Sequence, residues 1–350
     1  GRNSKPIQGE TFDLTLTVEG QALTLVYVDG TKGWIPVTAS EIVNQELYVT
    51  ATGGTPCTGA ICGDYKYHKF TGPGTFTVSC AGNAGGSNTV QTLIVAGGGG
   101  GAGGGGGAGG LRNLSCVAVT AQGYPITVGA GGNYGADPGS GGPVATNGDN
   151  SVGISNTAAG GGKGARNNAG NPAAPSVPVT DASPGGSGGG AGRTSGTDNN
   201  GGTGNTPAAP VSQGNPGGNF EYGGSPGGLS PANDSSAGGG GAGSAGASYT
   251  ANAATPGGNG LDVSPSFPAP LGGTPAGFYA GGGGGGNKDT PSTPGGGGQG
   301  GDGSPGTPTT DATAGATNTG GGGGGGQGTS GYGNGANGGS GIVIIKYKFQ

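Results

Sequence analysis

One stretch within the first fifty residues alternates between polar and apolar side chains with a period of two. In the stretch TFDLTLTV this alternation places four apolar side chains on one face of a strand: Phe12, Leu14, Leu16 and Val18. A second apolar run, ALTLVYV, leads into Asp29-Gly30, a pair favoured in tight turns, and then into GWIPV. Further on, ELYVTA also has the composition of a strand. We therefore predict a small β module over residues 1–51, with Trp34 in its core.

A turn-rich segment, TGGTPCTGAICG, follows at residues 52–63 and predicts a linker. Beyond it, YKYHKFTGPGTFTVSC and NTVQTLIVA are strand-like, and the chain ends on the β-branched strand GIVIIKYKF. These apolar strands lie on both sides of a long glycine-rich region. We predict that they and the glycine-rich region form a second domain, residues 64–350.

From Gly97 to Gly341 the pattern changes to runs of glycine separated by polar, proline-rich connectors. The protein has 99 glycines among 350 residues, whereas globular proteins contain about 7%. The purest runs are 97–101, 103–107, 160–162, 188–190, 238–241, 281–286, 295–298 and 320–326. They lack the strict three-residue repeat of collagen, and inside an α-helix each glycine would cost about 1 kcal/mol relative to alanine. Collagen and ordinary helix are therefore excluded.

The composition of this region is typical of a flexible coil or of a silk-like wall protein. Three features favour an ordered structure instead. The apolar strands TLIV and IVII bracket the glycine region as though its ends meet, the glycines come in blocks, and the aromatic residues fall in the connectors. A linker has no need of this segregation.

An ordered run of glycine has one natural conformation, a polyproline-II-like helix with three residues per turn and no internal hydrogen bonds. Its backbone groups must bond to neighbouring helices, and without side chains such helices can pack on every side as a hexagonal bundle. The run 320–326 would span about 22 Å at ~3.1 Å per residue. The predicted fold class is mostly β plus polyglycine II helices, framed by short β-strands and with essentially no α-helix.

The stretch TLIVAGGGGGAGG satisfies the G-x-G-x-x-G pattern of dinucleotide sites several times. Such glycines bind phosphate because a helix begins directly after them. Here the strand-like LRNLSCVAVT follows, and no glycine run ends in the Gly-Lys-Ser/Thr of a phosphate-binding loop. We predict no nucleotide and no other cofactor. Because the acidic residues of the glycine region occur singly, without the pairing of a general acid–base dyad, we also expect no catalysis.

Charge and hydropathy exclude two further classes. The net charge is −5 and the 12 basic residues are scattered, which leaves no basic face for nucleic acid. The longest apolar run, IVII at 342–345, is far shorter than the roughly 20 residues of a membrane span. The chain begins at GRNSKPIQ, without methionine, and we expect it to be a portion of a longer or processed protein.

Four cysteines and a single histidine offer little to a metal ion. The cysteine spacing is not that of a zinc site, and GGQGGD at 297–302 matches a calcium-repeat pattern only once, so we predict no metal. The motif CTGAIC fits a small disulfide loop between Cys57 and Cys62, and free buried thiols are at least as well supported. His68, within YKYHKF, is expected on a strand surface.

Taken in order, these motifs resemble a known family. HKFTGPGTFTV, TLIVAGGGGGAGGGGGAGG, YPITVGAGG, GGGGGGQG and GGSGIVIIKY are similar to the glycine-rich domain of bacteriophage tail-fibre and adhesin proteins, over residues 65–348. Lys346 stands where arginine is commoner in that family. The resemblance implies packed polyglycine II helices whose connecting loops recognise a bacterial surface receptor. It also implies an extracellular location on the virion, in a tail fibre or surface appendage.

Binding residues concentrate on exposed loops held by a rigid scaffold, and aromatic side chains are enriched at binding hot spots. The aromatic residues of the connectors are therefore candidates for receptor contact: Phe220, Tyr222, Tyr249, Phe267, Phe278 and Tyr279. The alternative is that these rings cover the ends of the glycine bundle as small local cores.

The expected function is that of a non-enzymatic adhesin that recognises a host-cell surface protein or glycan and assembles with other tail or appendage proteins. A homotrimer is expected if the domain caps a fibre, although some relatives act as monomeric tips. Two alternatives are open: a purely structural glycine-rich decoration or filament protein, and a disordered spacer with rapid amide exchange. We expect neither nucleic-acid binding nor insertion into a membrane.

Overall fold

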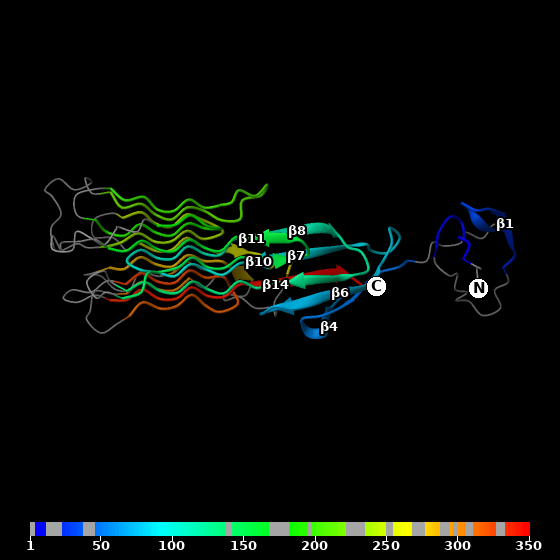
Figure 1. Ribbon diagram of the computed structural model, residues 1–350, viewed down its shortest axis with the longest axis horizontal. Coiled ribbons are helices and arrows are strands. Elements are labelled where there is room, and N and C mark those ends of the chain that lie inside the picture. The colour runs from blue at the N-terminus through cyan, green and yellow to red at the C-terminus, as the bar shows by residue number, and fades with distance from the viewer. Residues whose placement is uncertain are drawn as a thin grey trace.

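A computed structural model describes most of the chain as a small β module, a β-sandwich and a bundle of glycine tracts that extends away from the sandwich (Figure 1). The described residues are 4–11, 23–37, 46–136, 142–167, 182–194, 198–221, 235–249, 255–267, 277–287, 295–296, 300–304, 311–326 and 333–350. None of these residues lies in an α-helix, so the expectation of a mostly β protein is confirmed.

The N-terminal module is built on a hairpin of β1 (Leu25–Asp29) and β2 (Gly33–Pro36). The carboxylate of Asp29 accepts hydrogen bonds from two backbone N–H groups of the turn, at the place where the sequence predicts one. The ring of Trp34 is half-buried and lies 5.5 Å from that of Tyr27, in an edge-on arrangement. It is therefore less enclosed than the core position expected for it. The alternating stretch TFDLTLTV lies outside the described residues.

Two antiparallel sheets form the β-sandwich. The larger sheet has five strands in the order β4 (Thr55–Cys62), β5 (Tyr65–Phe70), β14 (Ile342–Lys348), β7 (Thr89–Val95) and β8 (Leu111–Ala118). The smaller has three strands in the order β3 (Val49–Thr52), β6 (Gly74–Ala81) and β9 (Gly123–Ile126). The main hydrophobic core receives side chains from both sheets.

These strands correct two expectations about domain boundaries. Residues 52–63, expected to be a linker, contain β4, which pairs with β5 in the larger sheet. The strand β3 falls at the end of the predicted module 1–51 but pairs with β6 of the smaller sheet. The glycines that suggested a linker, Gly53 and Gly54, have positive φ angles of 123° and 68° and carry the chain from one sheet to the other.

The last strand, β14, lies at the centre of the larger sheet between β5 and β7. Ile342 pairs with Val95, so the two apolar runs that bracket the glycine region meet, as the sequence predicts. The main core receives three of the β14 side chains: Val343, Ile345 and Tyr347. Ile342 and Ile344 lie in a second apolar cluster with other elements. Because both faces of β14 are covered, its sequence is almost continuously apolar rather than alternating.

His68 is fully buried, and its expected place on the strand surface is wrong. It lies on β5 and its ring stacks on that of Tyr347. Its Nδ1 lies 2.7 Å from the carbonyl oxygen of Gly53, and its Nε2 lies 3.0 Å from the hydroxyl of Tyr347. The sequence YKYHKF suggests an exposed strand, but the sandwich covers it. A histidine is tolerated there because both ring nitrogens have partners.

Two short hairpins lie where the glycine tracts join the sandwich. One consists of β10 (Ser151–Gly153) and β11 (Asn156–Ala158). The hydroxyl of Ser151 donates to the carbonyl oxygen of Val95 at 2.8 Å, which ties this hairpin to the end of β7. The other consists of β12 (Leu261–Asp262) and β13 (Phe278–Tyr279), and its neighbourhood supplies the second apolar cluster.

The glycine tracts hydrogen-bond to neighbours on all sides, and tract 103–110 is the clearest case. Successive N–H groups from Gly105 to Gly110 donate in turn to three tracts and then to the same three again: 235–241, 320–326 and 158–167. Its carbonyl oxygens accept hydrogen bonds from three other tracts: 96–102, 187–193 and 280–287. A repeat of three residues with neighbours on six sides is the arrangement of hexagonally packed polyglycine II helices. The predicted form of the glycine region is confirmed.

At its most enclosed glycines the lattice leaves no room for a side chain. A Cβ atom on Gly106 would lie 2.1 Å from the carbonyl oxygen of Gly99, and one on Gly283 would lie 2.1 Å from that of Gly323. Both distances are far shorter than any contact that a real Cβ atom makes. At these positions the tracts therefore pack backbone against backbone, which explains why both are glycine.

The outer tracts complete the lattice with polar side chains. In tract 142–150 the Oδ1 atom of Asn147 accepts the backbone N–H of Lys163 at 2.9 Å. Three residues later, the Oδ1 atom of Asn150 accepts that of Gly160 at 2.8 Å. These side chains satisfy backbone groups that a further glycine tract would otherwise satisfy. They close the edge of the bundle along this tract.

All four cysteines are free thiols in the structure, so the disulfide loop that CTGAIC could close is not formed there. Cys57 and Cys62 both lie in β4 and are exposed, as is Cys116, while Cys80 is half-exposed. None of the four thiols is buried, so the alternative of buried free thiols is not found either.

Candidate functional site

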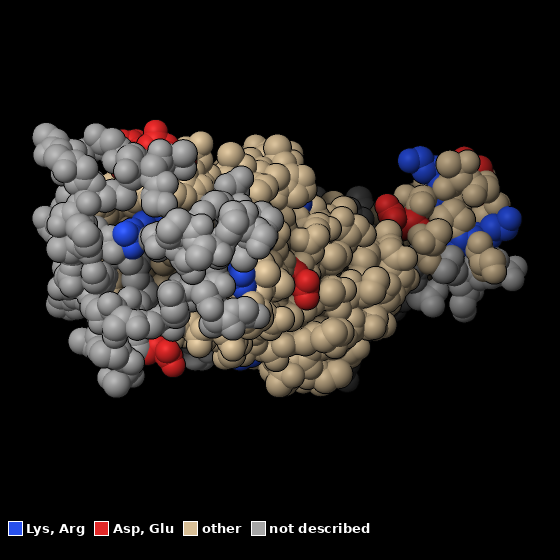
Figure 2. Space-filling view, turned by 60° about the vertical axis from the view of Figure 1, so that its left-hand side comes forward, with Lys and Arg blue, Asp and Glu red and all other residues tan. Residues whose placement is uncertain are grey.

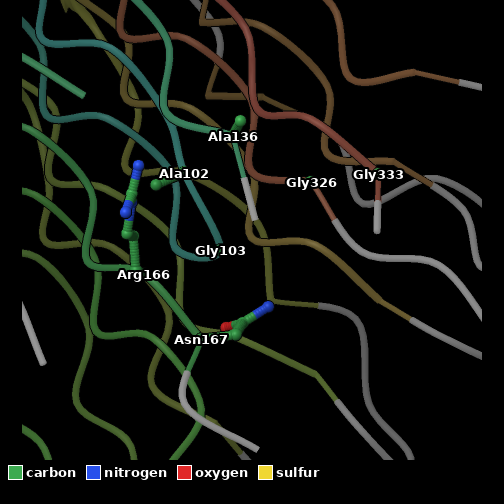
Figure 3. Close-up of a pocket in the computed structure, with 7 residues that line it drawn as sticks. All are labelled: Ala102, Gly103, Ala136, Arg166, Asn167, Gly326 and Gly333. Atoms are coloured by element: carbon green, nitrogen blue, oxygen red, sulfur yellow. The ribbon is translucent and has the colours of Figure 1, made fainter. Parts of the chain in front are cut away.

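The glycine bundle has two different ends. One end adjoins the β-sandwich, where β7 and β8 connect to it. At the other, which we call the far end, the chain turns at Ala102 and Gly103, and these two residues line one pocket together with Ala136, Asn167 and Gly326 from other tracts (Figure 3). The N-terminal module lies on the opposite side of the sandwich (Figure 1). The far end is therefore the part of the bundle most remote from that module.

The aromatic candidates Phe220 and Tyr249 form a small core within the bundle. Phe220 is 1% exposed and packs with Ala191 and Ala237. The ring of Tyr249 is half-buried and lies 4.9 Å from that of Phe220, measured between centroids. This contact joins two glycine tracts.

Phe267 and Tyr279 lie where the bundle adjoins the sandwich. They are 2% and 1% exposed and belong to the apolar cluster that contains Tyr67 and Ile344 of the larger sheet. Burial raises the pKa of the Tyr279 hydroxyl to about 12. Phe278, on the same hairpin, is half-buried.

The exposure of these rings therefore gives no support to receptor contact. Each ring among the described candidates is buried or half-buried. Phe220 and Tyr249 lie within the bundle, whereas Phe267 and Tyr279 lie at the sandwich, so the candidates do not form one surface. Local cores account for their positions. Tyr222 lies outside the described residues.

Lys346 of β14 contacts Ser266 and Phe267, in the segment before β13, and so links this segment to the larger sheet. Its Nζ donates to the carbonyl oxygen of Ser266 at 2.9 Å and lies 4.5 Å from the ring centroid of Tyr65. The rings of Tyr67 and Phe267 lie within 5.7 Å and 6.0 Å of the same atom. Burial lowers the pKa of Lys346. The cation thus holds a distant connector against β14 through three rings and a carbonyl group.

The far-end pocket places one buried arginine among small neighbours. It is lined by Ala102, Gly103, Ala136, Arg166, Asn167, Gly326 and Gly333. Arg166 is 6% exposed. Its Nη2 donates to the carbonyl oxygens of Gly142, at 2.8 Å, and Pro143, while its Nε has no hydrogen-bond partner.

Asn167 supports the wall of this pocket. Its Oδ1 accepts the backbone N–H of Arg193 at 2.9 Å and the hydroxyl of Ser236 at 2.7 Å. A Cβ on Gly103 would lie 2.1 Å from the same oxygen, so only glycine leaves Asn167 in this position. Sequence reasoning singled out neither Arg166 nor Asn167, because a single basic residue after a glycine run carries no signal of a site.

Charged side chains elsewhere lie singly among uncharged residues on the described face in Figure 2. Within the described ranges, no three histidine, cysteine or acidic residues gather where they could hold a metal ion. The described residues also contain no helix of the length and hydrophobicity that a membrane crossing requires.

Comparison with known families places most of the chain in one group. The sequence model of a family described as a glycine-rich domain matches residues 70–348. The match begins at the last residue of β5 and ends at the last residue of β14, so it includes the bundle and the strands that close it. No match was found among curated proteins or among solved structures.

Proposed function

The chain belongs to the glycine-rich domain family, and we propose that it acts as an adhesin of a bacteriophage tail fibre or related virion appendage. In this proposal the far end of the bundle recognises a protein or glycan of the host-cell surface, without chemical reaction. The N-terminal module faces the rest of the appendage and contacts other tail proteins.

The observation that carries this proposal is the opposite placement of the N-terminal module and the far end (Figure 1). Between them lies a scaffold whose enclosed tracts bond to neighbours on all sides. A rigid body fixed at one end presents its other end outward, and binding residues concentrate on chain segments held by such scaffolds. We assign receptor contact to the far end and to the connectors that leave it, such as residues 168–181, which lie outside the described residues.

The closed edge at tract 142–150 favours an adhesin over a structural filament protein. A filament that grows by adding bundles side by side needs unpaired backbone groups along its edge, as a β-sheet edge offers. Here the side chains of Asn147 and Asn150 already accept hydrogen bonds from backbone N–H groups of the neighbouring tract. The second candidate function, a purely structural decoration protein, would require another contact surface.

One chain supplies the whole sandwich and all the described neighbours in the bundle. This arrangement supports a monomeric tip. In a homotrimer, we propose that the subunits meet at the N-terminal module, where Val26 and Val28 are 50% and 55% exposed.

The test is binding of the labelled full chain to a panel of intact bacterial strains that includes a permissive host. One variant replaces residues 168–181 with a glycine–serine segment of equal length. A control variant replaces residues 208–211, in a turn at the sandwich end where Val211 is 76% exposed, in the same way. Equal unfolding temperatures establish that both variants fold.

Saturable binding by the parent and the control, lost in the 168–181 variant, supports recognition at the far end. Saturable binding that survives in both variants shows that residues 168–181 are not needed for recognition. Absence of parent binding to every permissive strain contradicts the adhesin function and favours the structural one.

A further inference from the structure

The sequence contains five asparagines that glycine follows directly, all of them in the glycine-rich region: Asn147, Asn200, Asn259, Asn334 and Asn337. In such a pair the asparagine side chain can lose ammonia without an enzyme, because the backbone nitrogen of the next residue attacks the side-chain carbonyl carbon. Glycine favours this attack, since it has no Cβ to obstruct the approach. All five pairs lie in the described part of the bundle, so the surroundings of the attacking nitrogen can be compared.

The attack requires the peptide group between the two residues to rotate until its nitrogen faces the side chain. In four of the pairs, the backbone of a neighbouring tract fixes this peptide group. The N–H groups of Gly148, Gly335 and Gly338 donate to backbone carbonyl oxygens of other tracts at 2.9, 3.1 and 2.9 Å. The carbonyl oxygen of Asn259 accepts hydrogen bonds from two backbone N–H groups. Rotation at these four positions would therefore break the lattice.

The peptide group between Asn200 and Gly201 is held differently. The N–H of Gly201 donates to a side-chain oxygen, Oδ1 of Asn219, at 2.9 Å. Within the described ranges, the carbonyl oxygen of Asn200 accepts no hydrogen bond. Asn200 and Asn219 are both exposed. An exposed side chain changes rotamer rapidly, whereas a carbonyl group of the lattice cannot move without its tract. The nitrogen of Gly201 is thus the one that is most easily released.

We propose that Asn200 is a site of spontaneous deamidation, and that the hydrogen bond from Gly201 to Asn219 limits its rate. The nitrogen of Gly201 gives up its proton and bonds to Cγ of Asn200, and the amide nitrogen leaves with that proton as ammonia. The cyclic imide that results takes up one water molecule and opens. The product is aspartate or isoaspartate, each with one new carboxylate. No group is oxidised or reduced.

Either product changes the edge of the bundle. The new carboxylate is ionised at neutral pH and adds negative charge to tract 198–206. In isoaspartate the backbone runs through the former side chain and is longer by a methylene group. The next lattice contact, from the N–H of Gly202 to the carbonyl oxygen of Gly189 at 2.8 Å, would then lose its register. Isoaspartate should therefore loosen this tract from tract 182–194.

The test is incubation of the full chain at mildly alkaline pH, where base removes the N–H proton more readily. Peptide mapping by tandem mass spectrometry then separates amide from acid at each asparagine. In the folded protein, deamidation should be faster at Asn200 than at the other four asparagines that precede glycine. In concentrated urea, where the lattice is absent, all five should react at similar rates, because the reacting pair is the same.

The variant Asn219→Ala removes the acceptor of the Gly201 N–H. It should raise the rate at Asn200 roughly two- to tenfold, the factor that one net hydrogen bond supplies. Asn215→Ala is the matched control, because Asn215 lies on the same tract but its Nδ2 donates to two carbonyl oxygens of tract 235–243. This control should leave the rate at Asn200 unchanged.

A rate at Asn200 that does not exceed the rates at the other four asparagines overturns the proposal, and this comparison needs only the parent protein. A rate that Asn219→Ala leaves unchanged also overturns it. Asn147 provides the internal reference in each variant: an equal rise there would mean that the whole lattice had loosened, and would overturn the role of Asn219. These outcomes are independent of cell binding.

Discussion

The hydroxyl oxygen of Tyr347 lies 3.0 Å from Nε2 of His68, which joins residues 279 positions apart in the sequence. Their rings are stacked, with centroids 5.6 Å apart. Phe76, from the smaller sheet, meets the ring of His68 edge-on at 5.3 Å. One buried imidazole thus connects the end of the chain, β5 and the opposite sheet. Burial lowers the pKa of His68.

Acid should destabilise the fold in the range where histidine titrates. The pKa of His68 is lowered from 6.5 in the folded protein, so the unfolded chain binds the proton more tightly. The contribution of neutral His68 is therefore complete above about pH 6.5 and is lost as the pH falls below that value. Because the sequence contains 1 histidine, urea unfolding between about pH 7.5 and about pH 5.5 isolates this group.

The variant His68→Gln provides the control for this prediction. It should be less stable by about 1–3 kcal/mol, because it disturbs buried hydrogen bonds, and its free energy of unfolding should vary less across the same pH range. A parent protein whose free energy of unfolding does not change with pH in this range contradicts the account of His68.

The lattice predicts opposite results for the same substitution at two glycines. Gly106→Ala places a Cβ 2.1 Å from a backbone oxygen and should destabilise by about 3 kcal/mol or more, since neither backbone can move without breaking other bonds. Gly72→Ala meets no atom within 4 Å and should change stability by less than about 0.5 kcal/mol. Chemical denaturation of both variants measures the difference, and equal losses would count against close packing.

Lys346 should contribute to stability through its aromatic neighbours. Lys346→Ala removes the hydrogen bond to Ser266 and the approach to the ring of Tyr65, with an expected loss of about 1–3 kcal/mol. Lys346→Arg should lose less, because the guanidinium group keeps both kinds of interaction. Thermal unfolding of the two variants tests this order, and a greater loss in the arginine variant contradicts it.

Reducing agents should leave the stability of the protein unchanged, because the four cysteines are free. A thiol reagent should modify the exposed Cys57, Cys62 and Cys116 rapidly in the native protein and the half-exposed Cys80 more slowly. A thermal midpoint that falls on reduction would instead reveal a disulfide that closes a loop.

The pattern of the sequence predicts the lattice but only part of what surrounds it. The runs of glycine and the apolar strands at Val95 and Ile342 are local signals, and the structure confirms their consequences. An outer tract is marked by a non-glycine residue at every third position, where the chain faces solvent. Pro216 and Asn219, three residues apart in GNPGGNF, are two such exposed positions. This period of three is visible in the sequence.

Burial of single residues depended on partners from distant parts of the chain. His68 is enclosed by the smaller sheet and by Tyr347, and Phe267 is covered through contacts with β14 and β5. No local pattern encodes these contacts. Arg166 was missed for the same reason, since the tracts that form its pocket are far apart in the sequence.

Amide hydrogen exchange across the bundle tests the central claim, a rigid glycine lattice that presents its far end. Amides of tract 103–110 donate to three neighbouring tracts and should exchange only through global unfolding, whereas Val211, 76% exposed in a turn, should exchange rapidly. Slow exchange throughout the tract supports the lattice. Exchange as fast as that of Val211 would show a disordered spacer and contradict the account.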